Sequence, residues 1–466
     1  MFEDTYFLNS HEALEVASQC NRTADGYRLQ VCYYEGDKIE SSLVNLVHLP
    51  IENLVDGLAN GTYNIPTLIN FDGLELSASV RYQIESHFNL SIQQAKILRE
   101  QKNYVYAENF KNAKLDFREP LRFYLMGHVQ TRVMQHVAKN IADQLEKMGF
   151  DVYFELFHGI EEQQCIKNLS LFNPHVFVSI NHLNNQHLSQ DIYNMIWFQD
   201  PMDILYSETE MQLRERDYVF SLVPMIDERL KVKNVPFERQ GFCVNQALYH
   251  QNELIQREKK IVFIGSSYAA TLKNTENEKE AVKKLQAMFL KGESFTQETI
   301  NSLSNVYALS SHHVESRLIP YVVRDFALLE LCKLDTQYSI EIYGWGWEKY
   351  AELAPYCKGS LEYGREIADV YSSATYAFAP HQQYTLQQRV FEASACGAIP
   401  IVYDCRDISK EDSYEEAFCY FKSLNDLEKI ITADVKQKNF DTLLQNNTYE
   451  SFIKKMLSKI KSNNVR

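Results

Sequence analysis

The chain predicts an α/β protein in which strands and helices alternate over two successive stretches. Short apolar runs that indicate buried strands recur along both stretches, and amphipathic helical segments separate them. The expected strands are 123–126, 152–157, 176–180, 195–198 and 218–223 in the first stretch, and 261–264, 339–343, 377–379 and 399–403 in the second. Alternation of this kind predicts parallel sheets with right-handed crossovers. We therefore expect two Rossmann-like units in tandem.

Changes of pattern divide the chain into four expected parts. These are an α/β accessory domain over 1–118, a Rossmann-like unit over 119–250, a second one over 251–435, and a C-terminal segment over 436–466. In the first part, Ser91 is the expected N-cap of a helix over 92–101. A long polar region reaches about residue 311 in the third part, and a helix over 319–331 follows it. The last part contains an expected helix over 449–461.

Composition excludes several classes of protein. With 47 basic and 62 acidic residues, the net charge is 47 − 62 = −15, whereas a nucleic-acid-binding protein needs a basic surface. The nine cysteines include no Cys-x-x-Cys pair, which argues against a disulfide framework and a structural zinc site. No run approaches the roughly 18 consecutive apolar residues of a membrane span. We expect a soluble, cytoplasmic protein. The basic face of the closing helix is expected to be solvated, and contact of this face with anionic lipid is the alternative.

The segment from Gln387 to Asp404 carries the strongest functional signal. Arg389 and Glu392 lie on a short helix of mostly small or apolar residues, which Gly397 ends before a buried strand. The backbone N–H groups at the start of this helix favour a phosphate. A carboxylate one or two turns further along can bind a ribose diol. Together these residues predict a site for a nucleotide diphosphate.

An ordered series of short motifs resembles a known family. The series is Phe263-Ile264-Gly265, Ile342-Tyr343-Gly344-Trp345-Gly346-Trp347, Tyr363-Gly364, Tyr371-Ser372-Ser373-Ala374 and Arg389-Val390-Phe391-Glu392-Ala393-Ser394-Ala395-Cys396-Gly397. It is similar to the C-terminal half of GT-B-fold glycosyltransferases, in the group related to the spore maturation protein CgeB, over about residues 260–430. The resemblance implies two facing Rossmann-like domains with a cleft between them. The C-terminal domain would hold a nucleotide-sugar, the N-terminal domain would hold an acceptor, and the closing helix would cross back.

The resemblance assigns roles to residues of the short helix. It places Glu392 on the ribose hydroxyls, and the alternative is an exposed glutamate paired with Arg389 three residues away. Arg389 would neutralise the diphosphate leaving group, because a guanidinium matches phosphate with paired hydrogen bonds. Amides near Gln387 would bind the same diphosphate.

Further donor-site candidates lie at expected strand ends. Gly265 and Ser266 form the turn after the first strand of the second unit, where glycine permits close approach of a ligand. Gly344 and Trp345 follow the next strand, where the base and sugar are expected; core packing is the alternative for the tryptophan.

His381 precedes the short helix and is a candidate contact to the donor sugar. Eight residues before Glu392, where many retaining enzymes of this fold carry a glutamate, the chain has Tyr384. The stereochemical outcome therefore stays open.

An inverting reaction needs a base that removes the acceptor's proton. The candidates are His128, in the turn expected after the first strand of the first unit, and Asp200, in Trp197-Phe198-Gln199-Asp200-Pro201.

These observations predict a glycosyltransferase that moves a sugar, most simply from a UDP-sugar, to a hydroxyl of a protein, a polysaccharide or a lipid-linked glycan. No metal and no cofactor beyond the donor are expected, since the sequence has no Asp-x-Asp motif. The alternatives are a nucleotide-sugar epimerase or hydrolase on the same fold, and a non-catalytic nucleotide-sugar-binding protein. The N-terminal domain is the expected site of any homo-oligomer contact.

Overall fold

We describe the protein from a computed structural model. The structure describes residues 5–8, 13–14, 31–33, 46–60, 65–66, 68–71, 74–118, 120–128, 131–157, 163–409, 411–436 and 438–463. The chain divides into two compact units. The first unit is Met1–Ser221 with Glu228–Glu238 and Lys459–Arg466, and the second is Leu222–Asp227 with Arg239–Ser458.

The first unit is built on a six-stranded sheet with strand order β10-β9-β8-β7-β5-β6. Its strands are β5 (Arg122–His128), β6 (Asp151–Phe157), β7 (Val176–Ile180), β8 (Tyr193–Phe198), β9 (Asp217–Ser221) and β10 (Phe237–Arg239). The strands from β5 to β9 pair in parallel. The strand order reverses between β5 and β7, because β6 lies on one side of β5 and the later strands lie on the other. In such sheets, ligands bind beyond the carboxyl ends of the strands at this switch point.

The helices of this region follow the predicted alternation. They are α4 (Arg132–Lys147), α5 (Gln163–Phe172), α6 (Asp203–Tyr206) and α7 (Pro224–Val232), with a short 3₁₀ turn, η2, at Asn185–His187. One local prediction is wrong: the expected tight turn at Gly127 and His128 is the end of β5 itself. An ideal Cβ at Gly127 would lie 2.6 Å from a methyl of Leu156, so glycine here lets neighbouring β6 lie close.

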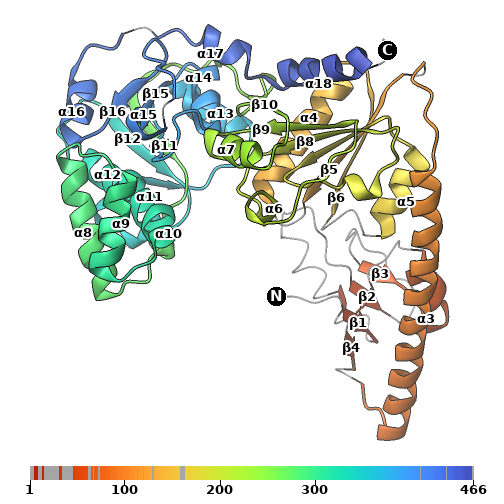
Figure 1. Cartoon of the computed structure of the whole chain (residues 1–466). Helices are drawn as coiled ribbons and strands as arrows, with labels where there is room; N and C mark the ends of the chain where they lie inside the picture. The colour runs from red at the N-terminus through yellow and green to blue at the C-terminus, as the bar shows by residue number, and fades with distance from the viewer. Residues whose placement is uncertain are drawn as a thin grey trace. The chain divides into compact units, whose positions relative to one another are not determined.

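The N-terminal part of the first unit contains a small parallel sheet with strand order β3-β2-β1-β4. Its elements are β1 (Thr5–Phe7), β2 (Val31–Tyr33), β3 (Leu46–His48), η1 (Ile51–Asn53), α2 (Leu54–Ala59), β4 (Leu68–Asn70) and the long helix α3 (Ala78–Lys111) (Figure 1). The expected cap at Ser91 is wrong, because the N-cap of α3 lies 14 residues earlier (91 − 77), at Ser77, which accepts the amide of Val80. Ser91 is instead buried in the helix interior.

The second unit has its own parallel six-stranded sheet, with strand order β13-β12-β11-β14-β15-β16. Its strands are β11 (Glu258–Ile264), β12 (Ser339–Tyr343), β13 (Cys357–Gly359), β14 (Ala374–Phe378), β15 (Ile399–Tyr403) and β16 (Cys419–Phe421). Its order reverses between β11 and β14. The two parallel sheets confirm the predicted fold class of two Rossmann-like units.

The helices of the second unit include two that the polar region before residue 311 did not predict, α8 and α9. The unit contains η3 (Ala269–Thr271), α8 (Glu276–Leu290), α9 (Gln297–Tyr307), α10 (Ser311–His313), η4 (Val314–Leu318), α11 (Ile319–Tyr321), η5 (Val322–Phe326), α12 (Ala327–Leu331), η6 (Trp347–Lys349), η7 (Ala351–Tyr356), α13 (Arg365–Ser373), α14 (Gln388–Ala395), α15 (Arg406–Ser409), α16 (Leu424–Thr432) and α17 (Asp441–Gln445). Helices α8 to α12 lie together in Figure 1. The segments η4 and η5 are π-helical turns within one continuous helix over 311–331.

The closing helix α18 (Tyr449–Asn463) ends in the first unit, to which Lys459–Arg466 belong. Its Ile460 carbonyl accepts the hydroxyl of Tyr193 on β8, and Lys459 pairs with Glu238 on β10. The predicted borders at residues 118, 250 and 435 divide the chain more finely than these two units and stay predictions. Within the described residues, no helix is long and apolar enough to cross a bilayer.

Two turns of the second unit approach each other so closely that only glycine fits. An ideal Cβ at Gly344 would lie 2.2 Å from the carbonyl oxygen of Gly265, and the φ of Gly344 is +131°. The amide of Gly265 donates to the carbonyl of Tyr343 at 2.8 Å, which holds the two turns together. The turns after β11 and β12 therefore form one backbone-to-backbone contact.

We predict that Gly344→Ala lowers the free energy of unfolding by about 3 kcal/mol or more, because backbone strain adds to an unavoidable overlap with Gly265. The matched control is Gly359→Ala, which also has a positive φ (+90°) but no atom within 4 Å of its Cβ. The control should lose only about 1 kcal/mol. Urea denaturation measures both, and equal losses would contradict the close approach.

Candidate functional site

The carboxyl end of β11 carries a turn that faces the switch point of the second sheet. Ser267 donates its amide to the carbonyl of Trp345 at 2.8 Å, which extends the contact between the turns after β11 and β12. The buried carboxylate of Asp325, on η5, holds this turn through hydrogen bonds. It accepts the hydroxyl of Ser267 at 2.6 Å and the amide of Tyr268 at 3.1 Å.

Asp325 also accepts the hydroxyl of Tyr350 at 3.0 Å, so three segments meet at one carboxylate. Burial raises the pKa of Asp325, and the hydrogen bonds from Ser267, Tyr268 and Tyr350, followed by the charge of Arg324, oppose that rise. A buried carboxylate is costly unless its oxygens are hydrogen-bonded, so this arrangement fixes the turn in one conformation.

Arg324, next to Asp325, extends its guanidinium over the same turn. Its Nη1 donates to the carbonyl of Ser266 at 3.3 Å, and the guanidinium carbon lies 4.0 Å from the ring centre of Tyr268. Its Nε is buried without a hydrogen-bond partner, and no carboxylate in the described part of the chain forms an ion pair with it. Sequence reasoning missed Arg324, although its place on a helix with two π-helical turns is typical of functional positions.

The two tryptophans after β12 have different environments. Trp347 is 1% exposed, and its indole N–H donates to the carbonyl of Gly265 at 2.8 Å. Trp345 is 70% exposed, so core packing, the alternative considered for it, applies to Trp347 alone. An exposed indole at a strand end is available to stack on a ligand.

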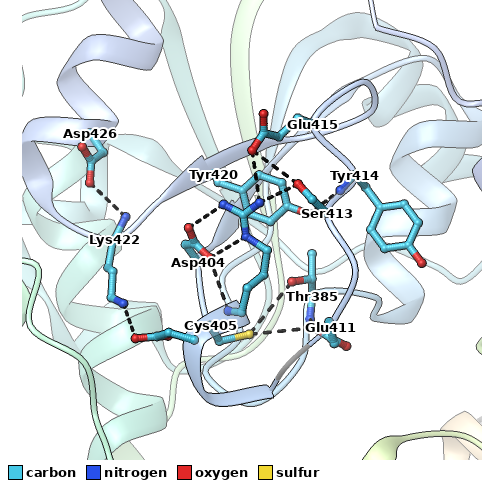
Figure 2. A network of polar contacts seen from close by, with 12 residues as sticks. Thr385, Asp404, Cys405, Glu411, Ser413, Tyr414, Glu415, Tyr420, Lys422 and Asp426 are labelled. Carbon is cyan, nitrogen blue, oxygen red and sulfur yellow. Dashed lines mark hydrogen bonds and ion pairs between the residues drawn. The ribbon is translucent and has the colours of Figure 1, made fainter.

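The predicted phosphate cradle before α14 is partly occupied by the protein itself. The amide of Thr385 donates to Glu411 at 2.7 Å, and the amide of Gln387 donates to the carbonyl of Thr385 at 2.9 Å. The side chain of Gln387 donates to the carbonyl of Ala379 at 2.7 Å. Figure 2 shows Thr385 beside Glu411 and Cys405, in the polar network that continues through Asp404. Two of the amides expected to bind phosphate are therefore already used.

Arg389 and Glu392 form an ion pair on α14 in which the carboxylate is buried and the arginine side chain is 35% exposed. The Nη1 of Arg389 lies 2.6 Å from Oε2 of Glu392, whose side chain is 1% exposed, and Gln388 donates to the other oxygen at 3.0 Å. Burial disfavours the charge of Arg389, but Glu392 and two nearby tyrosines raise its pKa above the usual value. The alternative for Glu392 is an exposed glutamate paired with Arg389. The pairing is present, but Glu392 is buried and not exposed.

Tyr249 adds an unused hydrogen-bond donor close to this pair. Its side chain is 1% exposed, and its hydroxyl has no hydrogen-bond partner in the described part of the chain. Burial, followed by the charge of Glu392, raises the pKa of Tyr249. No motif in the sequence indicated Tyr249.

His381 follows β14, on the other side of the switch point from Gly265. Its Nδ1 accepts the amide of Gln383 at 3.3 Å, which suits a neutral imidazole. Burial, and secondly the charge of Arg324, lower the pKa of His381 to about 3. The structure thus brings His381 and Arg324 into electrostatic contact at this edge.

The first sheet carries a cavity of about 250 Å³ at its own switch point. Both base candidates line it, since His128 ends β5 and Asp200 follows β8. Asn181, after β7, donates to the Asp200 carboxylate at 2.7 Å and accepts the amides of Gln199 and Asp200 at 2.7 and 3.0 Å. The ring of His182 lies parallel to that of His128, with centres 6.2 Å apart. The sequence did not indicate Asn181, whose buried side chain holds Asp200 in place.

Residues 324–458 match a protein family described as glycosyl transferase-like. The C-terminal part of the chain is a glycosyl transferase-like domain. The match confirms the resemblance over 324–430 and extends it to α18, while the turn after β11 lies outside it. Within the domain, Arg324 is the first matched residue, and His381, Arg389 and Glu392 are all included.

Several solved glycosyltransferase structures are similar to the chain in fold. AviGT4, a glycosyltransferase involved in avilamycin A biosynthesis, is 11% identical, with 73% of this chain and 97% of that chain covered and a TM-score of 0.40. Sucrose-phosphate synthase from Thermosynechococcus elongatus is 10% identical, with 73% and 94% covered and a TM-score of 0.39. Anabaena Alr3699/HepE in complex with UDP-glucose is 8% identical, with 73% and 100% covered and a TM-score of 0.42. No curated protein matches the chain in sequence.

The pKa of His381 predicts a pH dependence of stability. The unfolded chain binds a proton below about 6.5, whereas folded His381 stays neutral down to about 3, so the free energy of unfolding falls as pH falls through 6.5. We expect His381→Gln to remove on the order of 1 kcal/mol of the loss between pH 7.5 and pH 5. The exposed His312 gives the control His312→Gln, which should retain the whole loss. Chemical denaturation at both pH values tests this, and an unchanged loss in His381→Gln would refute the buried neutral imidazole.

Proposed function

We propose that the chain is a glycosyltransferase that moves a sugar from a nucleotide-diphosphate donor to a hydroxyl acceptor. The observation that carries the proposal is the polar cluster at the switch point of the second sheet. There, Arg324 contacts the glycine turn after β11 and acts on the imidazole of His381, and α14 with its buried Glu392 follows His381 along the chain. A cation near a close backbone turn suits a diphosphate, and a carboxylate suits a pentose diol. The match of residues 324–458 to a glycosyl transferase-like family supports sugar transfer as the reaction that this binding serves.

The chemistry follows from the donor. The acceptor oxygen forms a bond to the anomeric carbon, the bond between that carbon and the diphosphate oxygen breaks, and the diphosphate leaves with the electron pair. Cations and N–H donors that hold the diphosphate stabilise the charge that develops on it. In this proposal Gly265, Ser266 and Gly344 shape the donor site, and Trp345 and His381 line the sugar and base end.

The acceptor's proton is taken up in the first unit. We assign it to His128, with Asp200 as the alternative base, because both line one cavity at the carboxyl edge of the first sheet. Asn181 fixes the Asp200 carboxylate, which suits a group that orients an acceptor hydroxyl or accepts its proton. A UDP-sugar donor and a protein, polysaccharide or lipid-linked glycan acceptor complete the proposal.

A thermal-shift screen over uridine, guanosine, thymidine and cytidine diphosphates tests donor binding. We predict that one of them stabilises the wild-type protein and that Glu392→Gln removes most of this shift, because the pentose loses its carboxylate. Glutamine keeps the size and a hydrogen-bonding oxygen, and its unliganded melting temperature shows whether the fold survives the loss of the pair with Arg389.

The control is Glu428→Gln, an exposed glutamate on α16, which should shift like the wild type. Failure of all four nucleotides to stabilise the wild type would refute the proposed function, and an unchanged shift in Glu392→Gln would refute the role of the carboxylate.

Turnover tests the acceptor side. Once a donor is known, we predict that His128→Asn lowers kcat by about 10²- to 10⁴-fold with little change in donor binding, since it removes the base. If Asp200 is the base, Asp200→Asn should lower kcat in place of His128→Asn. The control is Asp203→Asn, at an exposed position on α6, which should retain the wild-type kcat. Full activity in both single variants would remove this cavity from the mechanism. Release of free sugar without any acceptor at a comparable rate would favour a hydrolase or an epimerase.

A further inference from the structure

The residues predicted to bind the diphosphate are already engaged within the protein. Arg389 forms an ion pair with Glu392 at 2.6 Å, and the amides of Thr385 and Gln387 donate to Glu411 and to the carbonyl of Thr385. A phosphate arriving at α14 would have to displace an ion pair that is buried on the side of Glu392. Displacing it leaves a carboxylate without its counter-charge, which is unfavourable in a buried place.

Arg324 lies at the same edge, and the charge of Asp325, the next residue, acts on it without forming an ion pair. Among the described residues, its side chain donates to a neutral carbonyl, that of Ser266, at a long 3.3 Å. Its Nε–H is buried and unpartnered, so it has a donor that only an added acceptor can satisfy. No ion pair with a carboxylate is found for it across the part of the chain that the structure describes.

The surroundings hold the guanidinium ready for an anion. It stacks 4.0 Å from the ring centre of Tyr268, and its Nη1 lies 3.9 Å from where a Cβ on Gly265 would be. Asp325, the next residue, accepts hydrogen bonds from Ser267, Tyr268 and Tyr350, which hold in place the turn that the guanidinium overlies. A planar, pre-oriented guanidinium above a glycine turn matches the paired oxygens of a phosphate.

We propose that Arg324 is the residue that holds the donor's diphosphate, and that Arg389 is a positioning residue for Glu392. The proposal deepens the function proposed above, because it divides that site into a phosphate part at the end of β11 and a pentose part on α14. The neutral imidazole of His381 fits this division, because the positive charge of Arg324 disfavours protonation of His381. Arg324 therefore meets the leaving group, and Arg389 acts only through the carboxylate it orients.

Inorganic pyrophosphate separates the two parts, because it has phosphates and no pentose. Isothermal titration calorimetry with pyrophosphate and with the stabilising nucleoside diphosphate gives the dissociation constants for each variant. We expect Arg324→Gln to weaken both ligands by about 10- to 100-fold, the loss of a charge-assisted hydrogen-bonded pair. Arg324→Lys, which keeps the charge but not the fork, should fall between the wild type and Arg324→Gln.

The double variant Arg389→Met with Glu392→Gln removes the pair without leaving a buried charge alone. We expect it to weaken the nucleoside diphosphate by a similar factor and to leave pyrophosphate within about twofold of the wild type. The matched arginine control is Arg365→Gln on α13, whose side chain is 86% exposed, and it should bind both ligands normally. Melting curves without ligand confirm that each variant is folded.

The outcomes distinguish the two proposals. Nucleotide binding that Arg324→Gln leaves unchanged overturns the inference while the proposed function stands. Pyrophosphate binding that depends on Arg324, without binding of any nucleoside diphosphate, supports the inference and overturns the function. Loss of pyrophosphate binding in the Arg389 variant, or no pyrophosphate binding by the wild type, overturns the inference.

Discussion

The candidate donor site depends on the buried carboxylate of Asp325. This one side chain accepts hydrogen bonds from the turn after β11 and from Tyr350, and it belongs to the helix that presents Arg324. Removing a carboxylate from water costs several kcal/mol unless donors surround it, so each of these bonds stabilises a specific arrangement of the segments. The close approach of Gly344 to Gly265 adds a second constraint at the same place, made by backbone alone.

Topology and side-chain chemistry select the same edge of the second sheet. Topology selects the gap between the carboxyl ends of β11 and β14, because the strand order reverses there. Side-chain chemistry selects the same place. Arg324 donates to the turn after β11, the imidazole of His381 follows β14, and the exposed indole of Trp345 follows β12, the strand next to β11. The first sheet has a comparable feature. A cavity lined by His128 and Asn181 lies where its strand order reverses, between β5 and β7.

Most of the fold could be predicted from the sequence because its strands are short, apolar and separated by amphipathic helices. The ranges of β7, β12 and β15 agree to the residue. Helix α8 was not predicted because its buried side chains lie among many charged ones, and α9 because it buries few side chains in a mostly polar, uncharged segment. The start of α3 was misplaced because Ser91, a residue typical of caps, is also tolerated inside a helix.

The candidate site was less predictable, because its partners come from distant segments. The pairing of Arg389 with Glu392 follows from their spacing of three, whereas their burial depends on packing that no local pattern reports. Arg324 and Asn181 carried no motif and became visible only through their contacts. The pair on α14 also has an evolutionary consequence. A lineage that replaced Arg389 alone would leave the buried carboxylate of Glu392 without its counter-charge, so Arg389 should be retained wherever Glu392 is.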